Sequence, residues 1–356
     1  MGHSTRASAS LHALVKLMIP VCQRAEREHP RRGPGRPPEI ADWVMLVLVT
    51  VAILKYRRNK SAQYRFLSQN RAKLLEWIGT TRFPSRSTYC ERYRRAHRLF
   101  QVAVRLQGRC LLKHQVGDAR CVAVDKSLIR SLGPKWPKRL RIQGKLLRGV
   151  DRESTWGYCK HHGWVQGYSY EVLLSAGKKG LVVPLLASVN QAHWSEHRSF
   201  PEKIPHLPRP TKYVLADSGY DGNDHADAIE RDSRGNPTGR RFLCPQIYRG
   251  GHRRQPGPFH DAHRARREVR TRREARYQYF KTKTARLHYS RRGRTAEPFH
   301  EWFKSTFQLH ERAWHRGLDN NRTQVLGALF AYQLLVRYNR RKHKHNGSVR
   351  WILDGL

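Results

Sequence analysis

Extreme positive charge narrows the possible roles of this chain more than any other feature of its composition. Its 356 residues include 70 Lys and Arg against 27 Asp and Glu, a formal net charge of +43 at pH 7. Nucleic acid is the usual partner of so basic a chain, because each phosphate that it neutralises releases condensed counterions. The length allows two domains, and the apolar residues are gathered in runs, so a folded core can form.

An anionic membrane is the alternative partner, and it requires an apolar anchor beside the basic residues. The candidate anchor is Trp43–Leu54, which as a helix would rise about 18 Å, well short of the roughly 30 Å of a bilayer core. We therefore predict a buried helix and no membrane contact. The first residues lack a signal-peptide layout, and the six cysteines form no C-x-x-C pair. Both observations favour a reducing cytoplasm.

The N-terminal part of the chain is predicted to begin with a helix and an irregular basic arm. Residues 1 to about 30 mix Arg, Ala and Leu and are compatible with a helix. Pro and Gly then interrupt residues 31–38 and prevent regular structure. Arg36 belongs either to an extended arm that enters an A·T-rich minor groove or to a charged linker.

Three further helices are predicted between Glu39 and Gly108, over residues 43–54, 61–77 and 85–106. The Ser and Thr residues within 85–88 are good N-caps for the last of them. The third helix is basic. Its arginines are Arg92, Arg94, Arg95 and Arg98. It is either the recognition helix of a small DNA-binding unit or a basic helix that rests on the following domain. We assign residues 1–117 to this all-α region.

Short apolar strands replace the helices after Asp118. The pattern predicts strands at 122–124, 163–174, 180–189, 213–216 and 241–244, with a helix over 224–231. Three strands followed by strand, helix, strand and helix is the order of an RNase H-like fold. We therefore expect an α/β domain over residues 118–345, with a mixed five-stranded sheet flanked by helices. Residues 346–356 are expected to form a tail.

A strongly basic insertion is expected at about residues 250–290 of this domain. Its middle is crowded with arginines, and Tyr277, Tyr279 and Phe280 follow closely. Aromatic rings that stack on bases and arginines that pair with phosphates suit a DNA surface, although a charge run is usually a solvated helix face. The scarcity of acidic residues nearby favours DNA. The arginines that we select as DNA contacts are Arg266, Arg267, Arg270 and Arg273.

Three carboxylates stand where they could form one site. Asp125 ends the apolar run that begins at Cys121, Asp217 ends the run that begins at Tyr213, and Glu297 opens a helical stretch. Carboxylates at strand ends, with one more on a helix, can hold two divalent cations through oxygen ligands. Each residue alone has a simpler explanation, as a turn residue or as a favourable charge in the first helical turn beside Pro298.

Four fragments together resemble the bacterial insertion-sequence transposases of the DDE class. They are Val124–Ser127, Gly163–Tyr168, Leu215–Asp221 and Glu297–Lys304. The most specific is Asp-Ser-Gly-Tyr-Asp from Asp217, after an apolar strand.

Members of this class commonly carry the signature Tyr-x2-Arg-x3-Glu-x6-Lys around the catalytic Glu. Glu297 and Lys304 keep the last interval of this signature, and Tyr289 and Arg292 keep the first. The middle interval is one residue too long here, so Arg294 is an alternative to Arg292.

The resemblance implies a DNA transposase that binds the ends of an insertion sequence and performs metal-dependent strand cleavage and strand transfer by a cut-and-paste route. Asp125, Asp217 and Glu297 would be the catalytic residues and would hold two Mg2+ ions, for which Mn2+ would substitute. The residues expected to contact DNA around them are Tyr289, Arg292, Arg294 and Lys304. The implied partners are the double-stranded terminal inverted repeats and target DNA, and a second copy of the chain in a homodimer. The implied location is the bacterial cytoplasm, at the nucleoid.

Three alternatives accompany this interpretation. Glu301, one helical turn after Glu297, is a second candidate for the third carboxylate. The run from His193 to His197 fits the H-x-x-E-H zinc pattern, but it follows a strand and precedes Pro201, which leaves little helix to hold zinc. The functional alternative is a catalytically inactive or repurposed transposase that acts as a DNA-binding protein.

Overall fold

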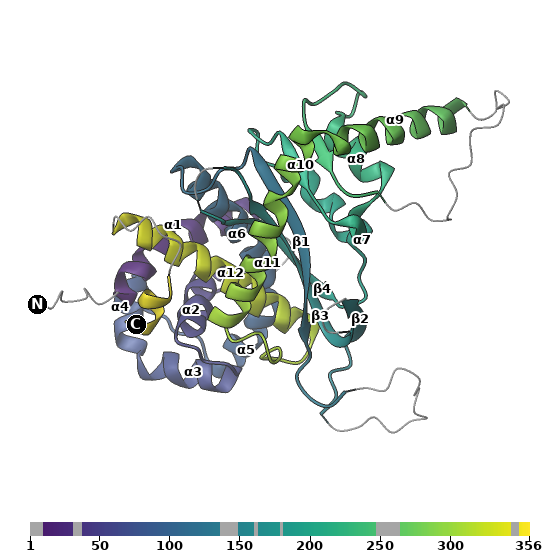
Figure 1. The fold of residues 1–356 in the computed structure, drawn as a ribbon. Helices are drawn as coiled ribbons and strands as arrows, with labels where there is room; N and C mark the ends of the chain where they lie inside the picture. The colour runs from purple at the N-terminus through teal and green to yellow at the C-terminus, as the bar shows by residue number, and fades with distance from the viewer. Residues whose placement is uncertain are drawn as a thin grey trace, which may run out of the picture.

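A mixed β-sheet with helices packed around it forms the centre of the molecule (Figure 1). The computed structural model describes residues 10–30, 38–135, 149–159, 163–178, 181–246, 264–342 and 349–356. The mixed α/β class predicted from the sequence is confirmed. In the described ranges the sheet has six strands: β1 Cys121–Arg130, β2 Thr155–Cys159, β3 Gly163–Ser175, β4 Pro184–Gln191, β5 Tyr213–Leu215 and β6 Arg241–Leu243.

Strand β1 occupies the middle of the sheet. It pairs antiparallel with β3, from Val122↔Ser175 to Arg130↔Gly167, and parallel with β5, which in turn pairs parallel with β6. On its other edge β3 pairs with β2 along its first part and with β4 along the rest. Apart from β2, the order β4-β3-β1-β5-β6 is compatible with an RNase H-like sheet. The prediction of five strands is wrong, because it missed β2, a five-residue strand interrupted by Gly157.

The side chains of β1 point alternately to the two faces of the sheet, and this places the candidate site on one of them. Val122 and Val124 point into the main core, whereas Cys121 and Ala123 belong to a second apolar cluster on the opposite face. Successive side chains of a strand alternate between faces. Asp125 therefore shares the face of Cys121 and Ala123. The strand continues to Arg130, so the prediction that Asp125 stands at a strand end is wrong.

Helices account for most of the remaining described residues. The N-terminal ones are α1 Leu11–Glu28, α2 Asp42–Leu54, α3 Lys60–Gln69, α4 Arg71–Ile78, α5 Arg86–Arg95 and α6 His97–Lys113. The others are α7 Glu196–Ser199, α8 Asn223–Glu230, α9 Arg264–Lys281, α10 Lys283–Tyr289, α11 Arg291–Thr306, α12 Leu318–Arg341 and α13 Arg350–Asp354, with 3-10 turns η1 Pro201–His206 and η2 Ser218–Tyr220.

The predicted helices over 61–77 and 85–106 are each divided in two. Asn70 separates α3 from α4 and leaves the helical region at φ −104°. Ala96 separates α5 from α6. The predicted N-cap is present, because the Ser85 side chain accepts a hydrogen bond from the backbone N–H of Thr88.

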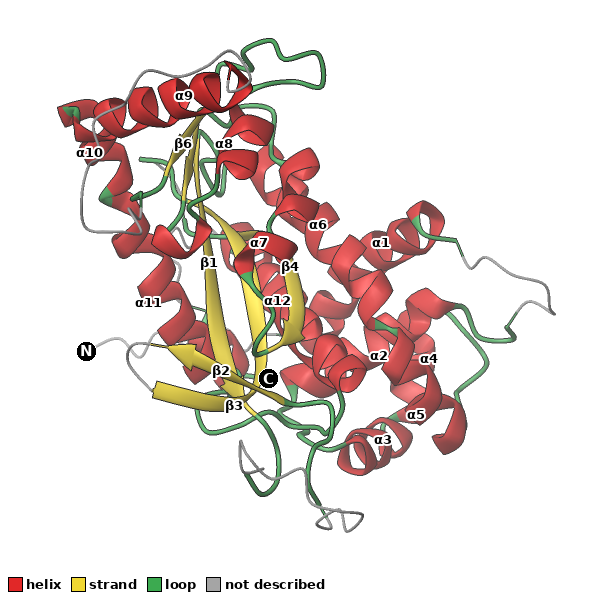
Figure 2. Cartoon of the chain, turned by 90° about the vertical axis from the view of Figure 1, so that its right-hand side faces the viewer, coloured by secondary structure: helices red, strands yellow, loops and turns green. Residues whose placement is uncertain are grey.

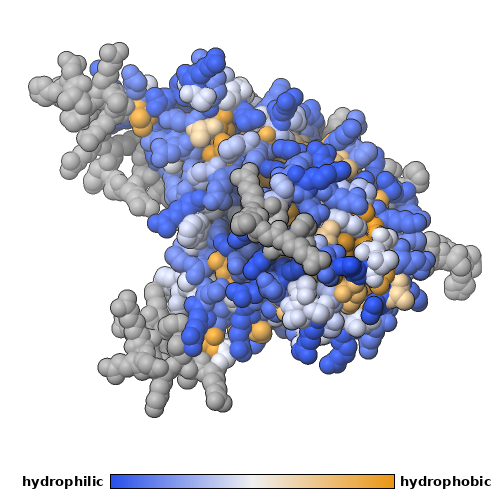
Figure 3. Space-filling model, turned by 180° about the vertical axis from the view of Figure 1, so that it is seen from behind, coloured by the Kyte–Doolittle hydropathy of each residue, from blue (hydrophilic) through white to orange (hydrophobic). Residues whose placement is uncertain are grey.

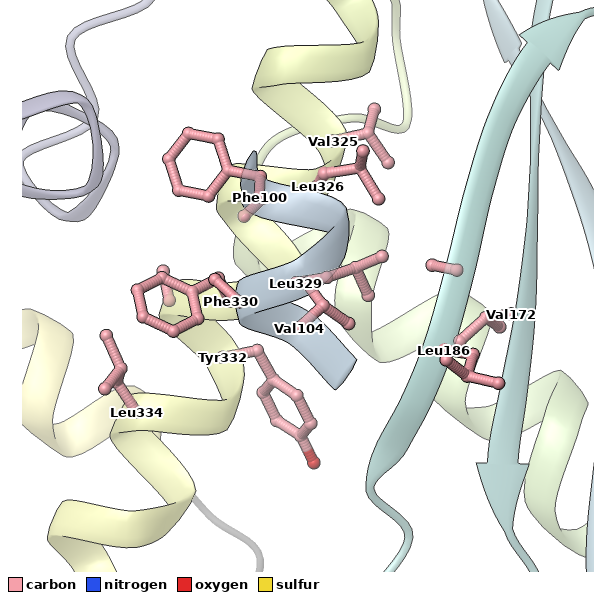
Figure 4. Close-up of a cluster of buried hydrophobic side chains, with 14 of the residues drawn as sticks. Phe100, Val104, Val172, Leu186, Val325, Leu326, Leu329, Phe330, Tyr332 and Leu334 are labelled. Carbon is pink, nitrogen blue, oxygen red and sulfur yellow. The ribbon is translucent and has the colours of Figure 1, made fainter. Parts of the chain in front are cut away.

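The main core joins the N-terminal helices to the sheet through α12 (Figure 4). Phe100 of α6 and Phe330 of α12 pack with ring centroids 6.0 Å apart, and Leu186 of β4 lies in the same cluster. A Cβ on Gly327 would lie 2.7 Å from Ile53 Cδ1, so this glycine permits α2 to approach α12 closely. The division of the chain near residue 117 stays a prediction.

Helix α11 runs beside β1, and α9 lies across the end of the sheet where β6 runs (Figure 2). Because α11 begins at Arg291, Glu297 and Pro298 lie in its middle. The prediction that Glu297 opens the helix is therefore wrong. Among the described helices none is both long and apolar enough to cross a membrane.

Candidate active site

Asp125 and Asp217 come together because their strands are neighbours. In the parallel pair of β1 and β5, Ala123 is opposite Leu215, and each Asp follows two residues later in its own chain segment. Asp217 lies just beyond β5 and caps η2, where its Oδ1 accepts a hydrogen bond of 2.9 Å from the N–H of Gly219. The two carboxylates therefore lie at the same level of the sheet.

A single guanidinium nitrogen joins the two carboxylates. Arg292 Nη2 lies 2.9 Å from Asp125 Oδ1 and 3.4 Å from Asp217 Oδ2. The Asp125 and Arg292 side chains are 12% and 14% exposed, so solvent screens this contact weakly. Both aspartates thus share one cationic partner, the Arg292 guanidinium.

His300 holds the other side of Asp125. Its Nε2 lies 3.4 Å from Asp125 Oδ2, and its Nδ1 is 2.7 Å from the hydroxyl of Tyr170 on β3. His300 comes from α11, eight residues after Arg292, and therefore about 80° around that helix from it. Sequence reasoning missed His300, although this spacing from Arg292 was readable.

The two aspartates have opposite pKa shifts. Burial raises the pKa of Asp125, but His300 and Arg292 outweigh it, so that the pKa lies below its ordinary value. Burial and the charge of Asp125 raise the pKa of Asp217, and Arg292 opposes this only in part. Arg292 therefore does not fully neutralise the repulsion between the two carboxylates.

Glu297 and Glu301 do not meet the aspartates in the described residues. Both are exposed on α11, and Glu301 pairs instead with His310 at 3.3 Å. With 3.6 residues per turn, Ala296 lies about 40° around the helix from Arg292, whereas Glu297 lies about 140° away. Ala296 is fully buried. The extra residue between Arg292 and Glu297 thus turns the glutamate away from the site.

The other residues predicted around the site lie along the same helices. Tyr289 packs its ring 4.9 Å from that of Phe280, and burial raises the pKa of Tyr289 to about 12. Arg294 is exposed, pointing away from the aspartates, and Lys304 is half-buried, where burial lowers its pKa. Arg292, rather than Arg294, is therefore the arginine that reaches the aspartates.

Glu196 is a carboxylate near the site that the sequence analysis did not select. It begins α7, and its Oε1 lies 2.7 Å from Lys126 Nζ on β1. The two histidines of the H-x-x-E-H run around it have different partners, so the run does not form the zinc site that the sequence analysis already judged poorly supported. His193 bonds to Thr155 Oγ1 at 2.9 Å, whereas His197 stacks on His225 with centroids 4.8 Å apart.

The basic segment contributes both exposed and ion-paired arginines. Arg273 forms an ion pair of 2.6 Å with Asp221, and Arg276 one of 3.3 Å with Asp227, which ties α9 to η2 and α8. Arg267 and Arg270 are exposed on α9. Arg36 and the side chain of Arg266 lie outside the described residues.

In the predicted recognition helix, one of the arginines forms contacts inside the protein. Arg92 of α5 pairs with Asp42 and donates to the carbonyl of Ile40 at 2.7 Å. Tyr93 is buried, with its hydroxyl 2.9 Å from His315 Nε2. These contacts fit a helix that rests on the rest of the protein, and DNA recognition by α5 stays a prediction.

Comparison with known proteins decides the family. Residues 117–334 match the family model described as transposase DDE domain, which covers more than half of the chain. The chain belongs to the DDE transposase family. No curated protein and no solved structure matches it. The matched range contains both aspartates, α11 and Glu196, so the family assignment and the geometry concern the same residues.

A divalent cation fits the aspartate pair in its donor chemistry. Asp125 and Asp217 offer hard carboxylate oxygens, and both already lie within 3.4 Å of one cationic nitrogen. The described residues contain no group of three His, Cys, Asp or Glu side chains arranged to hold a metal. In the described arrangement, Asp125 and Asp217 are thus the two carboxylates that could offer oxygen ligands to such an ion.

Proposed function

We propose that this protein is a DNA transposase that binds the ends of an insertion sequence and catalyses strand cleavage and strand transfer. The observation that carries the proposal is the convergence of Asp125 and Asp217, from adjacent parallel strands, on one cationic group. Membership of the DDE transposase family and the net charge of +43 support the same chemistry on DNA.

Asp125 and Asp217 would hold Mg2+ or Mn2+, with Glu297 as the third carboxylate that the motif spacing predicts. Two such ions, when bound, make the attacking oxygen more nucleophilic and stabilise the charge on the leaving oxygen. Glu297 can take this part only if α11 turns or shifts, because the glutamate is exposed and about 140° from Arg292 around the helix.

The basic groups would position the DNA strand against the aspartates. Arg292 would exchange its carboxylate partners for a phosphate, since a guanidinium binds either group through the same fork of N–H donors. Tyr289, Arg294 and Lys304 lie along α10 and α11 and would follow the backbone on either side of the scissile phosphate. Water would attack first and free a 3′-hydroxyl, which would then attack the target strand.

One face of the molecule is compatible with DNA binding in its hydropathy. The face in Figure 3 is mostly hydrophilic, with apolar side chains in small groups. Arg267 and Arg270 on α9 would bind phosphates together with Arg36 and Arg266. Arg273 would join them by exchanging Asp221 for a phosphate. A homodimer on the two element ends is the assembly that paired cleavage requires.

A second candidate function has an observation in its favour. The family spacing places the catalytic glutamate four residues after Arg292, and this chain has the buried Ala296 there. A repurposed transposase that retains DNA binding without cleavage would tolerate this alanine.

Incubation of the native element ends with protein and Mg2+ or Mn2+ separates the two functions. Metal-dependent cleavage that is lost in Asp125→Ala, with end binding retained, supports the transposase. Binding to the ends without cleavage by the wild-type protein supports the DNA-binding alternative.

A further inference from the structure

A line of contacts connects Asp125 of β1 to strand β3 by way of helix α11. Tyr170 of β3 stands opposite Ser127 in the antiparallel register, and Ser127 follows Asp125 by two residues. Opposite residues of two strands and alternate residues of one strand share a face, so Tyr170 and Asp125 lie on the same face of the sheet. The Tyr170 hydroxyl is 2.7 Å from His300 Nδ1, and His300 Nε2 is 3.4 Å from Asp125 Oδ2.

All three members of this line are held in the interior. Tyr170 is fully buried, and His300 and Asp125 are 7% and 8% exposed. The rings of Tyr170 and His300 meet edge to face with centroids 5.1 Å apart, and Phe299 and Phe303 of α11 pack against them. Close packing on these sides leaves the imidazole little freedom to turn. Each of its nitrogens therefore keeps its own partner.

These partners determine which nitrogen of a neutral His300 carries the hydrogen. A neutral imidazole has one N–H and one bare nitrogen, and the bond made by one nitrogen sets the state of the other. Burial raises the pKa of Tyr170 well above its ordinary value, so its hydroxyl keeps a proton to donate to Nδ1. A lone pair on Nε2 would face the negative charge of Asp125, whereas an N–H there is attracted to it.

The two oxygens of Asp125 consequently have different neighbours. Oδ1 lies 2.9 Å from Arg292 Nη2, the nitrogen that also approaches Asp217, and Oδ2 faces His300. The contact of 3.4 Å with His300 is long for a hydrogen bond, so it acts mainly through the attraction of the N–H dipole to the carboxylate. The last torsion of an aspartate is otherwise broad. Two donors on different oxygens therefore restrict the rotation of this carboxylate.

We propose that Tyr170 and His300 are positioning residues for the reaction at the aspartates. Tyr170 fixes the ring hydrogen of His300 on Nε2, and His300 in turn fixes the Asp125 carboxylate with Oδ1 toward Asp217. Both residues act through Asp125. The effect on strand cleavage rests on the proposed function, whereas the position of the ring hydrogen does not. Partners that orient a reactive side chain commonly change activity by about 10- to 100-fold.

Nitrogen NMR of the full-length protein, labelled with 15N at histidine, tests the first step without DNA. The His300 signals are assigned by their absence in His300→Gln. We expect the hydrogen on Nε2 and a bare Nδ1 in the wild type at neutral pH, and a mixture of both tautomers in Tyr170→Phe. A hydrogen on Nδ1 of the wild type, or an unchanged spectrum in Tyr170→Phe, would overturn the proposal.

Cleavage of the native element ends at saturating DNA tests the second step. Tyr170→Phe should lower the rate of cleavage by about tenfold and leave the Kd for the ends unchanged. The matched control is Tyr332→Phe, which removes a buried hydroxyl that donates to the carbonyl of Val182 at 3.1 Å and also packs on Phe299. It should cleave like the wild type. Equal losses of rate in both variants would show that Tyr170 has only a structural role.

Two replacements of His300 separate positioning from packing. The amide of His300→Gln can still donate to Asp125, whereas His300→Met fills a similar volume without a donor. We expect His300→Gln to retain several times more of the cleavage rate than His300→Met. Equal rates in the two variants would contradict a positioning role. If the wild type does not cleave, the proposed function fails, and with it the role in cleavage, while the NMR spectrum still decides whether Tyr170 fixes the ring of His300.

Discussion

Arg292 and Asp125 form an ion pair of 2.9 Å at the centre of the candidate site, and the same nitrogen lies 3.4 Å from Asp217. The arginine occupies the place toward which both carboxylates point. It therefore acts as a built-in counter-charge, which stabilises two adjacent acids in the absence of DNA and metal. A cation and a DNA phosphate together can replace it, the cation at the aspartates and the phosphate at the guanidinium.

Replacement of Arg292 tests this role. Arg292→Gln leaves two neighbouring carboxylates, one of them buried, without their cation and should lower the unfolding free energy by about 3 kcal/mol. Mg2+ should raise the melting temperature of this variant more than that of the wild type, because the ion no longer competes with the guanidinium. The control, Arg294→Gln, changes an exposed residue three positions from the helix start and should stay within about 0.5 kcal/mol. An equal or smaller effect of Mg2+ on Arg292→Gln would contradict the proposed competition.

The opposite pKa shifts of the two aspartates predict opposite effects of neutral substitutions. The lowered pKa of Asp125 means that its charge stabilises the fold above the unfolded pKa of about 3.9, and that this stability is lost as the pH falls through the lower folded pKa. The raised pKa of Asp217 means that its ionisation costs stability at neutral pH.

At pH 7, Asp125→Asn should therefore lower the melting temperature and Asp217→Asn should raise it. The deficit of Asp125→Asn should shrink as the pH is lowered toward 3. Melting curves of the metal-free proteins across this range provide the measurement. A higher melting temperature for Asp125→Asn at pH 7 would show that burial, rather than His300 and Arg292, dominates its environment.

The buried pair of Glu171 and Lys203 should be essential for stability. Both side chains are at most 5% exposed, and removal of one partner leaves an uncompensated charge in the interior. We expect Lys203→Met to cost about 3–5 kcal/mol of unfolding free energy, and the double variant with Glu171→Gln to recover part of it. Urea unfolding measures both. If the double variant is no more stable than Lys203→Met alone, the charge of Glu171 is not what destabilises the single variant.

The arginines of α9 should divide into two groups in their effect on DNA binding. Replacement of the exposed Arg267 by Gln should reduce the slope of log K against log salt by about 1, close to one for the phosphate that the protein no longer neutralises. Arg276 is paired with Asp227, so Arg276→Gln serves as the matched control and should leave the slope unchanged. Equal slopes for both variants and the wild type would show that α9 does not bind DNA.

The aspartates were predictable from the sequence, whereas their surroundings were not. Asp125 and Asp217 each follow an apolar run, and the strand order that such runs predict makes their strands neighbours. Glu196 and His300 approach the site only through tertiary packing, which no local pattern encodes. Glu171 and Lys203 were missed because charged residues are ordinarily exposed.

The third carboxylate shows why motif spacing alone is insufficient. The x6 interval from Glu297 to Lys304 matches the family, yet the side chain faces away from the aspartates because α11 begins at Arg291 and one extra residue follows Arg292. A single residue turns a helical side chain by about 100°. The start of a helix and the face of its residues had to come from the structure.

Metal-dependent cleavage at the ends of the native element, compared between the wild type and Asp217→Ala, tests the central claim most directly. We expect the wild type to cut both ends with Mg2+ or Mn2+ and to be inactive without metal. Asp217→Ala should bind the same ends with nearly unchanged affinity and leave them intact. Cleavage by Asp217→Ala at the wild-type rate would contradict the assignment of the aspartate pair as the catalytic centre.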